Sequence, residues 1–178
     1  MRFSLIDRIV EVEHGAKITA EKNVSLSEEY LQDHFPLFPV LPGVFMLEAA
    51  TQASAWLIRL SENFQHSMVL LTEANNIKYA SFVGPGHTLR VTSEITRQDE
   101  RFTKFKIKGM VDDTPTLSGR LVLERFNLVD TDPAGAAIDR HINKEQHDWL
   151  DLVYPNRPAI LPDDSPRPKD VAVPAAKV

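Results

Sequence analysis

The hydrophobic and polar positions of the first 126 residues predict strands on either side of one long apolar helix. Residues 4–25 alternate in the manner of strands and are broken by a turn signal at His14-Gly15, which is typical of a β-hairpin. Residues 44–60 are apolar around nearly the whole circumference of a helix. A helix of this kind is usually buried on every side, so we expect it at the centre of the domain.

After the helix the pattern returns to strands. Two short strand-like segments, residues 69–71 and 77–79, lie on either side of a polar break at Asn75-Asn76. Three longer strands are predicted to follow as a meander over residues 88–96, 102–111 and 117–126. The predicted fold class is therefore α+β, with an antiparallel sheet wrapped around one central buried helix.

The end of the chain has a different composition. Six of the 12 prolines fall within the last 24 residues, and the strand pattern stops near Asn127. We therefore predict a domain over residues 1–126 and a C-terminal extension over residues 127–178. Within the extension, residues 144–153 have the pattern of one more helix, and residues 155–178 are predicted to be an extended, proline-rich tail.

Composition narrows the class of protein. Of the 178 residues 43% are hydrophobic and 25% charged, which is enough to build a core. A net charge of −5 argues against a general nucleic-acid binder. The lack of cysteine excludes a disulfide scaffold and a thiolate zinc site. The sequence has neither an apolar run long enough for a membrane span nor the pattern of a signal peptide, so a cytoplasmic location is expected.

Candidate chemistry is concentrated between His34 and Gln52. Three prolines in seven residues fix the backbone of a loop that follows His34. Gly43 then stands at the start of the predicted helix, where the first N–H groups are free to bind an oxygen. Glu48 is a carboxylate on an otherwise apolar helix, an uncommon position unless the group is paired or functional. Each feature alone has an ordinary structural explanation, and only their combination indicates a site.

This segment resembles the active-site segment of the 3-hydroxyacyl-acyl-carrier-protein dehydratases, which have the hotdog fold. That family carries the pattern His-Phe-Pro-Gly-x-Pro-x-x-Pro-Gly-Val followed by Glu-Ala-x-x-Gln. The resemblance extends over about residues 5–126, and Leu37 departs from it where the family has glycine. The positions that match in register are His34, Phe35, Pro36, Pro39, Pro42, Gly43, Val44, Glu48, Ala49 and Gln52.

The resemblance implies dehydration of a 3-hydroxyacyl thioester on acyl carrier protein to the trans-2-enoyl thioester in fatty-acid biosynthesis. It implies that His34 is the base and that Glu48 is the acid. His34 suits the role of base because a neutral imidazole is available near neutral pH. The N–H groups of Gly43 and Val44 are the expected oxyanion contact, and Gln52 is expected to bind substrate or orient Glu48.

The resemblance also carries expectations about partners and cofactors. No metal or organic cofactor is expected, and no nucleic acid. In the family, the histidine and the glutamate of one site come from different subunits. We therefore expect a homodimer or a trimer of dimers, with acyl carrier protein as the partner that brings the substrate.

Three other functions remain open from the residues alone. A hotdog acyl-thioesterase would use a helix carboxylate without the His-Phe-Pro loop, and a non-catalytic acyl-binding module would lack His34 or Glu48. The presence of both residues favours a dehydratase. A dehydratase of a specialised lipid or polyketide pathway would use the same residues on another substrate.

Two further groups of residues have both a functional and an ordinary structural interpretation. Lys104, Lys106 and Lys108 share one face of a predicted strand, where they could attract an acidic carrier protein, although a solvated outer face is the more ordinary interpretation. His141 and His147 have a loose metal-like spacing around Glu145, but a surface helix explains them better.

Overall fold

The computed structural model describes residues 3–35 and 37–157 of the chain. None of the helices in these two ranges is long and apolar enough to cross a membrane. The elements follow one another as β1 (Arg8–Glu13), β2 (Lys17–Asn23), α1 (Tyr30–His34), α2 (Gly43–Ser61), β3 (Met68–Tyr79), β4 (Thr88–Gln98), β5 (Phe102–Val111), β6 (Thr114–Phe126), the 3-10 turn η1 (Leu128–Asp130) and α3 (Gly135–Val153).

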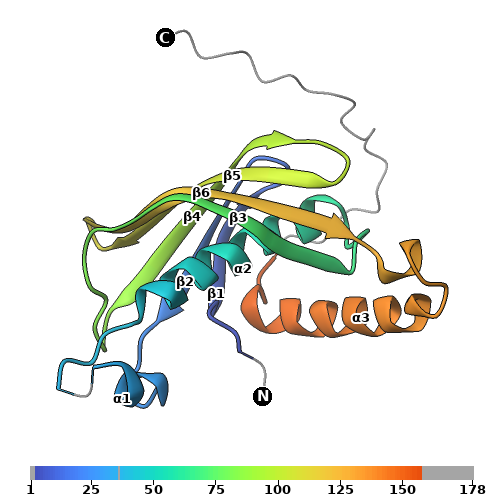
Figure 1. Ribbon diagram of the computed structural model, residues 1–178. Coiled ribbons are helices and arrows are strands. Elements are labelled where there is room, and N and C mark those ends of the chain that lie inside the picture. The colour runs from blue at the N-terminus through green and yellow to red at the C-terminus, as the bar shows by residue number, and fades with distance from the viewer. Residues whose placement is uncertain (1–2, 36, 158–178) are drawn as a thin grey trace, which may run out of the picture.

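The six strands form one antiparallel sheet in the order β1-β2-β4-β5-β6-β3. The sheet curves around α2, which runs along its inner face (Figure 1). This is the predicted α+β arrangement of a sheet around a central helix. The two edges of the sheet are β1 and β3, so the segment with α1 and α2 carries the chain from β2, beside one edge, to the opposite edge.

Small side chains bring α2 close to the sheet. Ala49, Ala50 and Ala53 are fully buried, so the helix backbone approaches the inner face of the strands. Ser54 and Ser93 are also fully buried, and their hydroxyl oxygens lie 2.7 Å apart between α2 and β4. The hydroxyl pair satisfies two polar groups that burial would otherwise leave without a partner.

β3 differs from the prediction. The sequence indicated a break at Asn75-Asn76, but one continuous strand of 12 residues runs through both. Asn76 has a φ of 54°, a left-handed conformation that asparagine tolerates, and the pairing with β6 shifts between Asn75 and Lys78. The polar break is therefore a β-bulge and not a turn.

α3 also differs from the prediction, because it begins at Gly135, nine residues before the predicted start at residue 144. Its first turns are held by Asp139, whose carboxylate accepts hydrogen bonds from the Ser67 hydroxyl and from the N–H groups of Leu128 (3.0 Å) and Val129 (2.9 Å). Burial opposes ionisation of Asp139, but these hydrogen bonds outweigh it and keep its pKa below the ordinary value. The prediction for the tail concerns residues 155–178, of which all but the first three lie outside the described residues.

Candidate active site

The start of α2 presents free backbone donors. The N–H groups of Phe45 and Met46 already bind the carbonyl of Pro42, at 2.9 and 3.2 Å. Within the described residues, the N–H groups of Gly43 and Val44 have no acceptor. These two donors stand at the positive end of a 19-residue helix, so they can bind an oxygen that carries negative charge.

Tyr79 closes one side of this helix start. A Cβ atom on Gly43 would lie 3.2–3.3 Å from three carbons of the Tyr79 ring, so glycine is the residue that allows this close approach. Desolvation raises the pKa of the Tyr79 hydroxyl above its ordinary value of 10.0. The ring is still 48% exposed, and it therefore forms one wall of an open site.

Glu48 lies one turn further along α2 and is held by Gln52. The Nε2 of Gln52 donates to Oε1 of Glu48 at 2.9 Å and to the carbonyl of Phe3 at 3.1 Å. The Oε1 of Gln52 accepts a hydrogen bond from the N–H of Leu5 at 2.8 Å. One amide side chain therefore fixes the Glu48 carboxylate and also holds the N-terminal segment against the helix.

His34 is the last residue of α1, and its side chain is exposed. Its ring lies 4.2 Å, centroid to centroid, from the ring of Phe35. In residues 3–35 and 37–157, no hydrogen bond joins His34 to Glu48. A single chain therefore brings Gly43, Val44 and Glu48 together on one half of α2 and carries His34 on a separate element.

The loop between His34 and α2 is held by the segment that follows β3. The N–H of Leu41 donates to the carbonyl of Val83 at 2.8 Å, and the Phe38 and Phe82 rings meet edge to face at 5.4 Å. The side chain of Leu37, which replaces the expected glycine, is fully exposed. Leu37 therefore projects into solvent in the single chain.

Sequence reasoning missed two parts of this site. Tyr79 and Leu5 lie outside α2 in the sequence and reach it only in the folded chain. The hydrogen bond from Leu5 to Gln52, for example, joins residues 47 positions apart. The one local signal was the uncommon pairing of two polar residues, Glu48 and Gln52, four positions apart on an apolar helix.

The fold and this helix start define a hotdog-fold protein with a polar site at the N-terminus of its central helix. The family model described as FabA-like domain matches residues 1–120. The chain therefore belongs to the FabA-like family. α3 lies outside the matched residues.

Curated relatives support the same family. A 3-hydroxyacyl-[acyl-carrier-protein] dehydratase FabZ of Listeria monocytogenes is 38% identical over 110 residues, which cover 62% of this chain and 76% of that protein. The FabZ of Magnetococcus marinus is 40% identical over 112 residues, 62% of this chain and 73% of that protein. The FabZ of Caldicellulosiruptor bescii is 34% identical over 120 residues, 67% of this chain and 86% of that protein.

Solved structures share the fold. The dehydratase heterocomplex ApeI:P of Xenorhabdus doucetiae has a TM-score of 0.58 at 21% identity, covering 71% of this chain and 85% of that one. A Streptococcus mutans protein solved with acetyl CoA has a TM-score of 0.55 at 12% identity, covering 71% and 93%. At these identities the likeness concerns the fold alone.

Proposed function

We propose that the chain dehydrates a 3-hydroxyacyl thioester carried by acyl carrier protein and releases the trans-2-enoyl thioester and water. This reaction would make the chain a hydro-lyase, and the curated relatives are named 3-hydroxyacyl-[acyl-carrier-protein] dehydratase. The observation that carries the proposal is the start of α2, where two free N–H groups and the Glu48 carboxyl lie on the same helix.

The chemistry assigns one role to each group. The neutral imidazole of His34 removes a proton from C2 of the substrate, and the negative charge that develops on the thioester oxygen is bound by the N–H groups of Gly43 and Val44. The protonated carboxyl of Glu48 gives its proton to the C3 hydroxyl, which leaves as water while the C2–C3 double bond forms. Transfer of the proton from His34 back to Glu48, directly or through solvent, then restores both groups.

Exposed apolar side chains around the site support the proposal that a second copy of the chain completes it. Phe35, Phe38, Val44, Tyr79 and Phe82 are between 48% and 66% exposed, although aromatic and branched side chains are normally buried. In the proposed homodimer, a second chain covers them and places its Glu48 next to His34 of the first chain.

The edge strand β3 is the surface through which we expect the two copies to meet. β3 has 12 residues and pairs on one side with β6, while Leu70 and Leu71 are 44% and 36% exposed. A long apolar edge strand favours pairing with another chain. A homodimer formed here would extend the sheet across both copies, and a trimer of dimers and a cytoplasmic location remain predictions.

The proposal is tested by a dehydration assay on 3-hydroxyacyl carrier proteins of several chain lengths, which follows formation of the conjugated enoyl product. Replacing Glu48→Gln or His34→Ala should each lower kcat by about a hundredfold or more, with a smaller change in KM. Near-full activity in either variant would reject the assignment. Release of free carrier thiol without an enoyl product would favour a thioesterase instead.

A further inference from the structure

The short helix that carries His34 needs an anchor outside itself. α1 has five residues, Tyr30–His34, and an isolated helix of that length is not stable in water. Within residues 3–35 and 37–157, no hydrogen bond or ion pair holds the His34 side chain, whose one ring contact is with the neighbouring Phe35. The position of the imidazole therefore depends on what fixes α1 to the rest of the domain.

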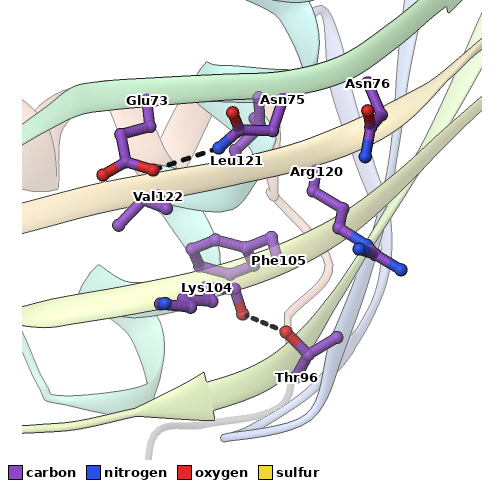
Figure 2. A pocket seen from close by; sticks show the side chains of 9 residues that line it. All are labelled: Glu73, Asn75, Asn76, Thr96, Lys104, Phe105, Arg120, Leu121 and Val122. Carbon is purple, nitrogen blue, oxygen red and sulfur yellow. Dashed lines mark hydrogen bonds between the residues drawn. The ribbon is translucent and has the colours of Figure 1, made fainter.

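A lysine on the inner side of the sheet lies next to α1. Ile18 and Ala20 of β2 are fully buried in the core, and Lys22 follows on the same side of the strand. Lys104 and Arg120 on the outer side of the sheet, drawn in Figure 2, are both exposed to solvent. Lys22 is only 5% exposed, so its ammonium group has to be compensated by groups of the protein.

Two carboxylates compensate Lys22, and one of them belongs to the segment that starts α1. The Nζ of Lys22 lies 2.7 Å from Oε1 of Glu28 and 3.4 Å from Oδ2 of Asp7. The same oxygen of Asp7 accepts a hydrogen bond from the N–H of Asn23 at 2.7 Å. The carbonyl of Glu28 accepts the N–H of Leu31, inside α1, at 3.1 Å. The ion pair therefore ties the end of β2 to the first turn of α1.

Apolar contacts complete the anchorage of α1. Leu31 is 1% exposed and packs into the core, and the Tyr30 ring meets the Phe45 ring of α2 edge to face at 4.8 Å. The Tyr30 hydroxyl oxygen is buried and has no hydrogen-bond partner in the described part of the chain. Burial and the negative charge of Glu28 raise the pKa of this hydroxyl above its ordinary value of 10.0. The surroundings of α1 are thus poor in water, and Lys22 supplies the positive charge beside them.

We propose that Lys22 is a positioning residue for the dehydration, because its ion pair with Glu28 fixes α1 and thereby places the imidazole of His34 for proton removal. Without the ammonium group, the carboxylates of Asp7 and Glu28 would repel each other in a partly buried corner, and α1 would move away from β2. His34 would then spend less time in the geometry that proton removal requires. The inference rests on the proposed function for the reaction, but not for the anchorage of α1.

Variants at Lys22 and Glu28 test this role by steady-state kinetics. Lys22→Met keeps an unbranched side chain and removes the charge, so kcat should fall by about tenfold with little change in KM. Lys22→Arg keeps the charge and should recover most of the rate. Glu28→Gln, at a partly exposed position, keeps an acceptor for Lys22 and should lower kcat by a smaller factor; it replaces Lys22→Met if that variant does not fold. Wild-type kcat in folded Lys22→Met would overturn the inference, as it would in Glu28→Gln if that variant stands in.

A matched control lies one residue earlier on the same strand. Glu21 is also a buried ionised group with two partners, but these are Arg8 on β1 and Arg90 on β4, and neither belongs to α1. Glu21→Gln should therefore leave kcat unchanged, even though it removes a buried charge from β2. A fall in kcat as large as that of Lys22→Met would show a general effect of destabilising β2 and would overturn the inference.

Mixed dimers separate positioning of His34 from general destabilisation. In a dimer of one Glu48→Gln chain and one His34→Ala chain, the working site of the proposed function takes His34 from the first chain and Glu48 from the second. Lys22→Met in the first chain, together with the working His34, should lower the restored rate by about tenfold. The same change in the second chain should leave that rate unchanged. Equal losses from the two placements would overturn the positioning role.

Hydrogen exchange of the peptides that cover α1, followed by mass spectrometry, keeps this inference distinct from the proposed function. The N–H of Leu31 donates to the carbonyl of Glu28, so its exchange reports whether the first turn of α1 is formed. These peptides should exchange faster in Lys22→Met than in the wild type or in Glu21→Gln. If the wild type dehydrates no 3-hydroxyacyl substrate, the proposed function fails, while faster exchange confined to α1 would still support the anchorage by Lys22. Wild-type exchange of α1 in Lys22→Met would overturn the anchorage, whatever the activity.

Discussion

Replacing Gln52→Leu tests whether one side chain holds both the N-terminal segment and Glu48. Leucine is similar in size and keeps the helix, but it removes the acceptor of the Leu5 N–H and the donor to Glu48. Leu5 is 2% exposed, so its N–H would be left without a partner away from solvent. Such a group costs about 1–3 kcal/mol of unfolding free energy.

A loss of about 2 kcal/mol corresponds to a fall in Tm of roughly 4–8 °C for a chain of this length. The fall is measured by circular dichroism at one fixed protein concentration, because the proposed dimer would make Tm depend on concentration. Loss of the hydrogen bond to Glu48 should lower kcat by about tenfold with little change in KM, because the proposed acid is no longer held in position.

The variant Gln52→Glu separates the two effects. A carboxylate still accepts from the Leu5 N–H, so Tm should fall less than in Gln52→Leu. An ionised carboxylate no longer donates a hydrogen bond to Glu48, so kcat should fall about as far as in Gln52→Leu. Wild-type kcat in both variants would refute the positioning role, and an unchanged Tm in Gln52→Leu would refute the stabilising role.

Two further predictions concern stability. In the Ser54–Ser93 pair, Ser54→Ala leaves the buried Ser93 hydroxyl without a partner and should lower the unfolding free energy, measured in urea, by about 1–3 kcal/mol. Ser93→Ala should lower it less, because the Ser54 hydroxyl still donates to the carbonyl of Ala50. Equal losses in the two variants would contradict this account. Burial opposes ionisation of Glu21, but hydrogen bonds and charges from Arg8 and Arg90 outweigh it and hold its pKa below 4.5. The contribution of Glu21 to the unfolding free energy is therefore complete above the unfolded-state pKa and is lost as pH falls through the lower folded-state pKa. Glu21→Gln should for this reason make the unfolding free energy less dependent on pH in the acid range. An unchanged slope of unfolding free energy against pH would contradict the assignment.

The central helix and most of the sheet could be predicted because their patterns are local. The apolar run over residues 44–60 lies within α2, and alternation around Phe105 and Ile107 identifies the buried side of β5. β3 was predicted less well, because a polar pair at Asn75-Asn76 looks the same in sequence whether the backbone turns or bulges. Pairing with β6 decides between the two, and pairing is not a local property.

The site could be predicted only in part, for the same reason. Spacing along α2 places Glu48 and Gln52 on one helix face, but the contacts of Gln52 with Phe3 and Leu5 depend on how the N-terminal segment crosses the helix. The early start of α3 depends on Asp139, whose partner Ser67 is 72 positions away. The strand register was also needed to see that Arg97 lies opposite Lys104 and that Lys106 lies opposite Arg120.

The measurement that tests the central claim most directly is complementation between two inactive variants. His34→Ala and Glu48→Gln chains are purified separately, then mixed in equal amounts under conditions where native mass spectrometry shows exchange of subunits. If His34 of one copy works with Glu48 of the other, each mixed dimer contains one intact site, and random mixing should restore about one quarter of the wild-type rate. A mixed sample that is no more active than the two separate variants, despite proven exchange, would contradict the shared site.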